Sequence, residues 1–507
     1  MSKKNNEPSP LARRDFFKAA TTVAGAFVLG TAAETATAEA SPQAAKPQAK
    51  PTPTAAPATK IVGKIKIAVP VVDAANMKGG IFPKGTVMAP PSAKGANDRI
   101  TIASIGVGGA GIGQGKLHLN SFIKEAEQRN TAVVAICDVY QPFVDETVAI
   151  AKTKQANVMG TNDYRKVLER KDIDAVIIAT PEHWHGQISV HAMQAGKHVY
   201  CEKPLVRYIE EAWQVYDVAK STKSVIQIGS QGCTDVRWHA AAKAIKDGAL
   251  GKLVMGQGSY CRCNRNGEWN YQIPDSINAT NFDWDLWLGS APSRPFVSPK
   301  GAGNGAETTR NDAGARFRRY RKYTDYSAGI LGDLMPHRLH PFLIASGNPE
   351  FPTRVMSIGT HGVQNKDREV ADTVQVMAEF PSGWSMLFIG STVNEQGLPD
   401  LFRGEKATVY FGSTKVEVKP ERPFSDEVEG FIVDTSAPEL ARFHPTEDVG
   451  AHERNWLEAI RKNDPMHCNC NIDLAVKAQV IISLAEMSQR MGKSMNFDAK
   501  NRKVTAG

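Results

Sequence analysis

The sequence predicts an α/β protein that combines a doubly wound parallel sheet with a second, open sheet. Strand-like and helix-like runs alternate between residues 98 and 225, which is typical of parallel strands joined by crossover helices. A glycine-rich turn joins the first strand to the first helix. Beyond residue 350 the strand-like runs are rich in β-branched and aromatic residues, as expected for a sheet with one covered face.

The expected elements follow from these patterns. In the first sheet we expect strands at residues 100–105, 132–137, 175–180 and 198–201, and helices at 117–127, 164–170 and 188–195. In the second sheet we expect strands at 355–359, 373–380 and 384–390, and a hairpin of 406–411 with 415–418. Amphipathic helices over 452–461 and 472–491 are expected to return to the first domain.

The turn Gly106-Val107-Gly108-Gly109-Ala110-Gly111 has the pattern G-x-G-x-x-G between a strand and a helix. Gly106 would allow the tight turn, Gly108 would let a pyrophosphate approach the backbone, and Gly111 would let the helix pack closely on the strand. The helix N-terminus would add partial positive charge. We therefore predict that Gly106, Gly108, Gly109, Ala110 and Gly111 bind a dinucleotide.

Asp138 follows the second strand and selects the type of dinucleotide. A carboxylate at this place accepts hydrogen bonds from both ribose hydroxyls and repels a 2′-phosphate. We therefore predict NAD as the cofactor, with NADP as the alternative. The spacing from Gly106 exceeds the usual twenty or so residues, which an extended first helix explains.

Two polar segments follow the later strands of the same sheet. They are Thr180-Pro181-Glu182-His183-Trp184-His185 and Glu202-Lys203-Pro204. Ligands of doubly wound sheets bind beyond the carboxyl ends of the strands, so both segments are expected to border the cleft. Trp184 offers a flat apolar face to a nicotinamide or sugar ring.

A third polar group lies in the second domain. Asp333, His337 and His340 stand at positions i, i+4 and i+7 of an expected helix, with Pro336 tolerated in its first turn. They would share one helical face. Catalysis is the first interpretation, and a facial metal site made by the same three side chains is the second.

Three motifs together resemble the Gfo/Idh/MocA oxidoreductase family, over about residues 98–503. They are the glycine turn, Thr180-Pro181 followed by His185, and the run from Gly196 to Pro204; secreted members share segments like 284–289 and 332–337. The resemblance implies a Rossmann domain followed by an α+β domain with a large, mostly antiparallel sheet, and a sugar or polyol as substrate. It implies that Lys203, Asp333 and His337 form the catalytic group, and that Thr180, Pro181, His185, Glu202 and Lys203 contact the cofactor.

Oxidation of a secondary alcohol requires that the hydroxyl proton leave as hydride departs from carbon. We expect His337 to accept this proton, Lys203 to stabilise negative charge on the same oxygen, and Asp333 to orient the imidazole. The roles of Lys203 and His337 could be exchanged. His340 departs from the family pattern, in which an Asp at this place contacts substrate hydroxyls, so the substrate stays open.

Further substrate contacts are expected from polar and aromatic residues around the cleft. The predicted substrate residues are His340, Arg338, Trp184, Gln231 and Arg262, with Arg237, Tyr260 and Trp269 as additional candidates. The basic run at residues 316–322 is interpreted first as a solvated loop. The alternative is a rim that attracts uronates, sulfated sugars or a partner subunit.

The first residues predict export. Arg13-Arg14-Asp15-Phe16-Phe17-Lys18 is a twin-arginine pattern, followed by an apolar run and the small-residue site Ala38-Glu39-Ala40. We expect a twin-arginine signal peptide at 1–40, a Pro/Ala-rich spacer and arm at 41–97, and domains at 98–225 and 226–503. The predicted location is periplasmic or secreted. Because that compartment has no obvious pool of nicotinamide cofactor, the cofactor is expected to stay bound and to be recycled.

Composition excludes several classes of protein. The net charge of +8 is modest for 507 residues and gives no case for nucleic acid binding. No segment after the signal offers about twenty continuous apolar residues, so stable membrane insertion is not expected. Seven cysteines are an odd number and lie too sparsely for a disulfide scaffold. The C-x-C pairs at 261–263 and 468–470 leave disulfides open; a four-thiolate metal site is the other alternative, although the pairs lack the usual two-residue gaps. The open sheet suggests a homo-oligomer.

The predicted function is that of an exported oxidoreductase acting on a carbohydrate hydroxyl. The first alternative is an NAD-dependent glycosidase or lyase that oxidises C3, eliminates the aglycone and reduces the product, as the α-N-acetylgalactosaminidases of this family do. Those enzymes generally lack the Glu-Lys-Pro lysine, so Lys203 argues against close kinship. The second alternative, a non-enzymatic sugar-binding protein, is disfavoured because Lys203, Asp333 and His337 occur together.

Overall fold

The computed structural model describes residues 94–507 except 96, 109–112, 300–311 and 365–367. All described residues belong to one compact unit. The predicted signal, and the spacer up to residue 93, lie outside the described residues, and so do Gly109, Ala110 and Gly111. The boundary predicted near residue 225 stays a prediction. Within the described part, no helix combines the length and apolar character needed to span a membrane.

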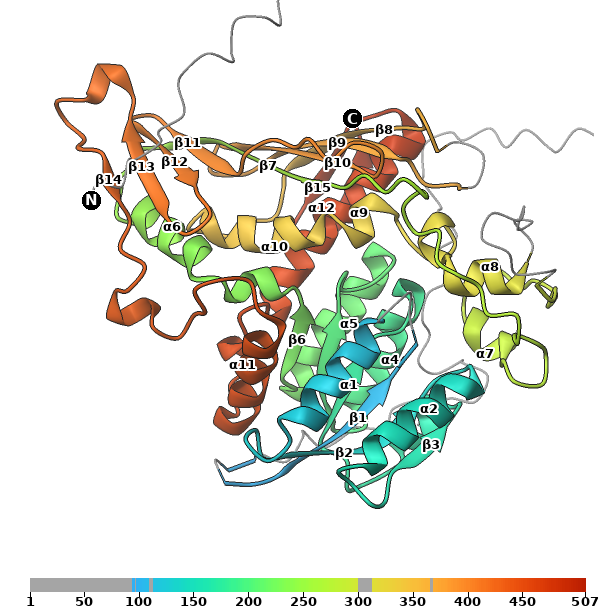
Figure 1. Cartoon of the computed structure of the whole chain (residues 1–507). Helices are drawn as coiled ribbons and strands as arrows, with labels where there is room; N and C mark the ends of the chain where they lie inside the picture. The colour runs from blue at the N-terminus through green and yellow to red at the C-terminus, as the bar shows by residue number, and fades with distance from the viewer. Residues whose placement is uncertain (1–93, 96, 109–112, 300–311, 365–367) are drawn as a thin grey trace, which may run out of the picture. The chain divides into compact units, whose positions relative to one another are not determined.

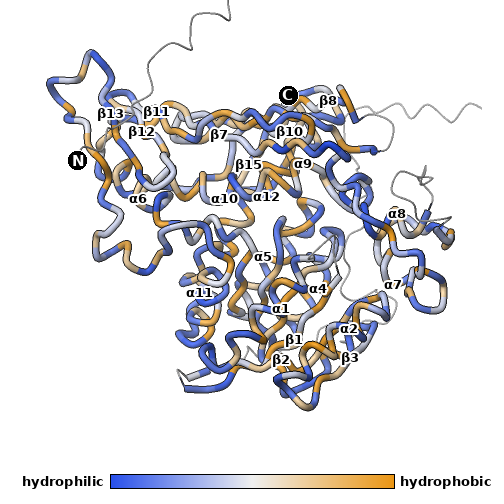
Figure 2. Tube along the Cα trace, in the orientation of Figure 1, coloured by the Kyte–Doolittle hydropathy of each residue, from blue (hydrophilic) through white to orange (hydrophobic). Residues whose placement is uncertain are grey.

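The first sheet has six parallel strands in the order β3-β2-β1-β4-β5-β6, which confirms the doubly wound fold (Figure 1). Its strands are β1 (Ile100–Ile105), β2 (Thr131–Cys137), β3 (Met159–Thr161), β4 (Ala175–Ile178), β5 (His198–Glu202) and β6 (Ile226–Gly229). The connecting helices are α1 (Gln114–Lys124), α2 (Gln141–Lys152), α3 (Tyr164–Leu168), α4 (Glu182–Gln194) and α5 (Ile209–Thr222). Figure 2 shows hydrophobic residues along β1 and β2, where every strand residue except Thr101 is buried.

The second sheet has ten strands in the order β14-β13-β12-β11-β7-β10-β9-β8-β15-β16, and only β7 with β10 is a parallel pair. Its strands are β7 (Leu253–Cys261), β8 (Arg354–Thr360), β9 (Thr373–Glu379), β10 (Ser385–Ser391), β11 (Leu401–Gly404), β12 (Ala407–Phe411), β13 (Val416–Pro420), β14 (Phe431–Ile432), β15 (Met495–Asp498) and β16 (Lys503–Ala506). The large, mostly antiparallel sheet predicted from the family resemblance is thereby confirmed.

Helices cover one face of the second sheet. Figure 1 shows α6 (Val236–Lys246), α10 (Pro336–Ala345) and α12 (Ile472–Met491) beneath its strands. The remaining helices are α7 (Trp284–Leu288), α8 (Ala313–Arg318), α9 (Ile330–Asp333) and α11 (Val449–Lys462), with 3₁₀ turns at Gln231–Thr234, Tyr320–Lys322, Arg422–Phe424, Pro438–Leu440 and Pro465–His467. All seven cysteines are free thiols, so the two C-x-C pairs form no disulfide.

Predicted helices differ from the observed ones in their bounds, by three residues at each end of α1, and most at α4 and α10. Helix α4 begins at Glu182, six residues before the expected start, because residues 182–193 are all buried and leave no polar face that marks its beginning. The single helix expected over Asp333 to His340 is wrong. Instead α9 ends at Asp333 and α10 begins at Pro336, where the ring of proline fits a helix start.

A buried charge cluster joins α11 to the first sheet. Nδ1 of His118 lies 2.6 Å from Oε1 of Glu453 in α11, and Nε2 lies 2.9 Å from Oε1 of Glu202 in β5. Arg129 donates to the other oxygen of Glu453 at 2.6 Å. Burial disfavours charge on His118, but the two carboxylates outweigh burial and raise its pKa from 6.5 to about 9. The imidazolium therefore holds β5 and α11 together.

Close packing of α1 on β1 depends on Gly115. A Cβ atom at this position would lie 1.8 Å from the carbonyl oxygen of Gly106 and would also press on Val107. No side chain can be accommodated so close to backbone. Gly115 therefore meets the need for close helix packing that we had assigned to Gly111, a position outside the described residues.

We predict that His118→Gln destabilises the protein in a pH-dependent way. Since the folded-state pKa is raised, the stabilisation is fully present below pH 6.5 and is lost as pH rises through about 9. The free energy of unfolding should fall by about 3 kcal/mol more at pH 6 than at pH 9.5. Urea unfolding of both proteins at each pH measures this, and an equal loss at both pH values would contradict the charged imidazole.

We predict that Gly115→Ala lowers the free energy of unfolding by about 1–3 kcal/mol or more, because backbone must shift to admit the methyl group. Thermal or urea unfolding measures the loss. Gly362→Ala is the matched control, since a Cβ there meets no atom within 4 Å and its φ is not in the left-handed region. Equal stability of the two variants would show that α1 can move away from β1 without cost.

Candidate functional site

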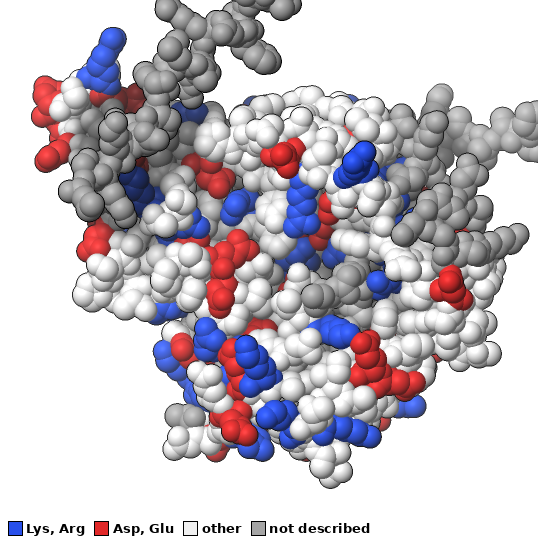
Figure 3. All heavy atoms as spheres, in the orientation of Figure 1, with Lys and Arg blue, Asp and Glu red and all other residues white. Residues whose placement is uncertain are grey.

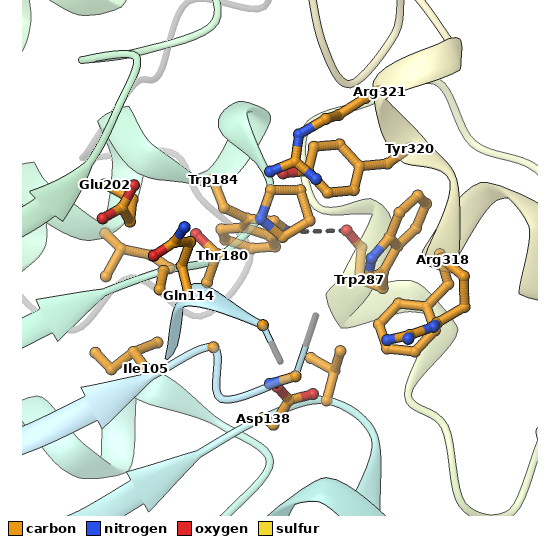
Figure 4. A pocket seen from close by; sticks show the side chains of 18 of the residues that line it. Ile105, Gln114, Asp138, Thr180, Trp184, Glu202, Trp287, Arg318, Tyr320 and Arg321 are labelled. Atoms are coloured by element: carbon orange, nitrogen blue, oxygen red, sulfur yellow. Dashed lines mark hydrogen bonds between the residues drawn. The ribbon is translucent and has the colours of Figure 1, made fainter. Parts of the chain in front are cut away.

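A cavity of about 210 Å³ opens at the carboxyl ends of β1, β2, β4 and β5 (Figure 4). On one side it is lined by the glycine turn and the strand ends of the first sheet. On the other side it is lined by residues of the second domain, from the segments around residues 262–287, 317–321 and 333–337. The site predicted at the strand ends is therefore a real hollow between the two sheets.

On the cofactor side of the cavity, backbone N–H groups of the glycine turn bind the carboxylate of Asp138. Oδ2 of Asp138 accepts hydrogen bonds from the backbone N–H groups of Val107 and Gly108, both at 2.9 Å, and Oδ1 accepts from Tyr140. Burial raises the pKa of Asp138, and these N–H donors oppose that shift. The predicted acid thus shapes the turn as well as facing the cavity.

The turn leaves room for a dinucleotide. Gly106 has φ +82°, and a Cβ there would lie 2.7 Å from the backbone nitrogen of Thr180, so only glycine allows this conformation. Gly106, Gly108, Thr180 and Pro181 expose backbone or small side chains to the cavity. These residues fit NAD, with the pyrophosphate against the turn and the ribose toward Asp138.

Lys203 and Asp333 meet across the cavity. Nζ of Lys203 donates to the carbonyl oxygen of Asp333 at 2.9 Å and to Oδ1 at 2.7 Å. Nε of Arg321 lies 2.8 Å from the same Oδ1, and Trp269 donates its indole N–H to Oδ2 at 2.9 Å. Burial disfavours charge on Asp333, but Arg321 and Lys203 outweigh burial and hold its pKa far below the usual range.

This geometry corrects the predicted role of Asp333. We expected its carboxylate to orient and tune His337, whereas its oxygens bind Lys203, Arg321 and Trp269. The charge of Asp333 still acts on His337 and raises the pKa of the imidazole against the larger effect of burial. The imidazole of His337 instead stacks on Tyr260, with ring centroids 5.1 Å apart. Burial and the nearby Lys203 ammonium lower the pKa of His337 well below 6.5, so the ring is neutral at pH 7.

His340 does not reach the cavity. Its side chain is fully buried, and Nδ1 donates to the carbonyl oxygen of Pro336 at 3.0 Å. The break between α9 and α10 separates it from Asp333, so the predicted shared face and the alternative facial metal site are both wrong. Residues 94–507, within the described ranges, contain no group of three His, Cys, Asp or Glu side chains suited to a metal ion.

The other predicted residues divide into two groups. Trp184, Arg262 and Glu202 line the cavity, and Trp184 donates its indole N–H to the carbonyl oxygen of Trp287 at 2.8 Å. Glu202 also receives the hydrogen bond from His118.

The second group lies outside the cavity lining. The ring nitrogens of His185 lie 2.7 and 2.9 Å from the carbonyl oxygens of Pro204 and Thr180. The ring therefore connects the loops that follow β4 and β5. Arg338 lies 3.5 Å from Asp400, and Gln231 begins a 3₁₀ turn.

Several lining residues were missed. They are Gln114, Tyr164, Tyr271, Trp287, Phe317, Arg318, Tyr320 and Arg321. Arg318 and Arg321 belong to the basic run that we interpreted first as a solvated loop, which is wrong because Arg316 and Lys322 are buried and these two face the cavity. In the sequence, only the density of arginines in this run indicated that it could line a binding site.

Residues 100–230 match a family model, GFO_IDH_MocA, described as an oxidoreductase family with an NAD-binding Rossmann fold. Among curated proteins, the chain is 33% identical over 168 residues to a glycosyl hydrolase family 109 protein of Shewanella sp. (strain W3-18-1), covering 32% of this chain and 35% of that one. It is 30% identical over 217 residues to an alpha-N-acetylgalactosaminidase of Shewanella oneidensis, covering 42% and 45%. The chain thus spans less than half of these relatives' length.

Solved structures share the fold over a larger part of the chain. An oxidoreductase domain protein from Kribbella flavida has a TM-score of 0.57 at 18% identity, covering 79% of this chain and 99% of that one. Levoglucosan dehydrogenase in complex with NADH and levoglucosan has a TM-score of 0.54 at 18% identity, covering 79% and 99%. An aldose-aldose oxidoreductase from Caulobacter crescentus has a TM-score of 0.54 at 16% identity, covering 79% and 100%.

The family model confirms the predicted NAD-binding Rossmann domain, and the solved structures share the fold over 79% of the chain. Residues 100–230, which form the first sheet, thus match the Gfo/Idh/MocA family of NAD-binding oxidoreductases.

Proposed function

We propose that this protein oxidises a hydroxyl group of a sugar, polyol or glycoside with NAD that stays bound and is recycled internally. The observation that carries the proposal is the presence of the Lys203 ammonium and the neutral His337 imidazole in the cavity that the glycine turn also lines. The NADH and sugar complexes named for levoglucosan dehydrogenase support a carbohydrate substrate.

Lys203 is prepared to bind the reacting oxygen. An ammonium group has three donors, and Asp333 accepts two of them. The third donor is available to a substrate oxygen, whose developing negative charge it would stabilise. Because Asp333 fixes the ammonium from two directions, the donor is oriented before substrate binds.

His337 is prepared to take the proton. Burial and the Lys203 ammonium lower the pKa of His337, so the ring is neutral and a ring nitrogen has a lone pair available for the hydroxyl proton. The Lys203 donor to the same oxygen would make that hydroxyl more acidic and so offset the weaker base. Stacking on Tyr260 fixes the plane of the ring. NAD, when bound, supplies the acceptor for the hydride, and the residues of this chain supply orientation and proton transfer.

The proposal includes export by the twin-arginine route to the periplasm or beyond, and assembly into a homo-oligomer. The pattern from Arg13 to Lys18 supports export. A retained cofactor follows from it, because an exported enzyme needs a second carbonyl substrate, or a later step on the same sugar, to return the hydride. Exposed apolar side chains on β8 and β9, among them Ile358 and Met377, support assembly through the uncovered face of the second sheet.

A second candidate is a glycosidase that oxidises, eliminates and reduces. The names of the relatives from Shewanella favour it. Lys203 favours the simple oxidoreductase, since glycosidases of this kind generally lack that lysine. The two reactions differ in whether the glycosidic bond breaks.

We predict that Lys203→Ala slows reduction of the bound nucleotide by sugar at least about 100-fold while the nucleotide stays bound. The lost contact is to the reacting oxygen and not to the turn that holds the cofactor. Stopped-flow absorbance at the nicotinamide band measures reduction, and mass spectrometry of released ligand measures occupancy. Lys220→Ala, at an exposed lysine, is the control. Undiminished reduction in Lys203→Ala would refute the role.

We predict that a methyl glycoside incubated with the enzyme in D₂O keeps its methyl group. Oxidation followed by elimination would release methanol and place solvent deuterium on the carbon next to the oxidised one, whereas alcohol oxidation alone breaks no glycosidic bond. Proton NMR detects both changes. Methanol release that depends on the enzyme would establish the glycosidase instead.

A further inference from the structure

The cavity carries an unbalanced positive charge near Lys203. Three cations line this end of the cavity: Lys203, Arg262 and Arg321. Arg262 lies 3.3 Å from Glu268, which neutralises it. The other two cations share the single carboxylate of Asp333. The next carboxyl group that acts on Arg321 is Glu182, which accepts hydrogen bonds from Ser327 and Ala328 and whose pKa burial raises to about 7. Since His337 is neutral, this end of the cavity carries an excess of positive charge.

The unmatched cation is best identified with Arg321. Its Nε lies 2.8 Å from Oδ1 of Asp333 in an ion pair, but this buried nitrogen makes no hydrogen bond to any residue in the described ranges. The guanidinium lies over the ring of Tyr320, at 4.6 Å from the centroid, and only 19% of its side chain is exposed. Figure 4 shows Arg321 beside Tyr320 at one side of the cavity, with Asp138 at the other.

A shielded guanidinium with unfilled donors gains most from an anion. Its planar fork matches the two oxygens of a carboxylate or sulfate, and the pair is stronger where water is excluded. The remaining lining carboxylates do not compete, because Glu202 binds His118 and Asp138 lies at the glycine turn. On the face shown in Figure 3, acidic and basic side chains are interspersed, so the excess charge is a local feature of the cavity.

We propose that Arg321 selects a sugar that carries an acidic group, a uronate carboxylate or a sulfate ester, as the substrate. The inference rests on the proposed sugar oxidation and specifies its substrate class. Arg321 and Lys203 contact the same oxygen of Asp333, so the two cations are neighbours. The acidic group bound by Arg321 and the hydroxyl that reacts at Lys203 therefore lie on one sugar ring.

Equilibrium binding to the nucleotide-loaded protein tests the inference without requiring turnover. Isothermal titration would compare D-glucuronate with D-glucose and D-galacturonate with D-galactose, pairs that differ only in the acidic group. Glucose 6-sulfate distinguishes sulfate from carboxylate. Wild-type protein should bind at least one acidic sugar about tenfold or more tightly than its neutral partner.

Arg321→Gln should reduce this preference to about twofold or less, since a neutral side chain gives no charge-assisted bond. Arg321→Lys keeps the charge without the fork and should retain part of the preference. Arg319→Gln is the control from the same segment; this arginine donates to the backbone oxygen of Tyr271 and should keep the full preference. The ratio of acidic to neutral affinity is the readout, so a general loss of folding cannot mimic the result.

Equal affinity of wild-type protein for acidic and neutral sugars, or no binding of either, would overturn the inference. So would an unchanged ratio in Arg321→Gln. Reduction of the bound nucleotide by neutral sugars but not acidic ones would also overturn it while supporting the proposed oxidation. Binding of acidic sugars with no reduction by any sugar would support the inference and remove the proposed function.

Discussion

The carboxylate of Asp333 is the constraint on which the site depends. It lies in a buried place where an isolated negative charge would be costly, so cations must accompany it. Lys203 comes from the end of β5 in the first sheet, and Arg321 comes from a 3₁₀ turn that precedes α9. Electrostatic pairing therefore sets the distance between the two sheets at the point where chemistry is expected. A change in that distance would move the Lys203 ammonium, the His337 imidazole and the glycine turn away from one another.

Strands β1, β2, β4 and β5 of the first sheet could be predicted from sequence because they are apolar runs bounded by turn residues. Strands β3 and β6 were not predicted, since β3 has only three residues, none of them buried, and β6 has only four. The start of α4 could not, since its first twelve residues are buried on all sides and show no amphipathic period. The break between α9 and α10 was also missed. Proline is equally acceptable inside the first turn of one helix and at the start of a second, so sequence alone did not distinguish these arrangements.

The candidate site was predictable where a residue belongs to a local motif. Lys203 and His337 were found in this way, and the structure brings both to one cavity. Arg321 belongs to the basic run for which a solvated loop was the first interpretation and a rim that attracts anions the alternative. Sequence could not decide between them, because a run of arginines has the same composition whether it faces water or a cavity. The partner of Asp333 was misjudged for a related reason: Lys203 lies 130 positions earlier in the chain, and spacing within one helix cannot reveal so distant a contact.

The hydrogen-bonded contact between His118 and Glu453 has a consequence during synthesis of the chain. These residues are 335 positions apart, yet their contact completes the buried network behind β5. A nascent chain that has emerged only as far as β6 holds the His118 half of this network without its closing carboxylate. Until α11 has been synthesised, the first sheet therefore lacks the carboxylate that pairs with His118 and Arg129.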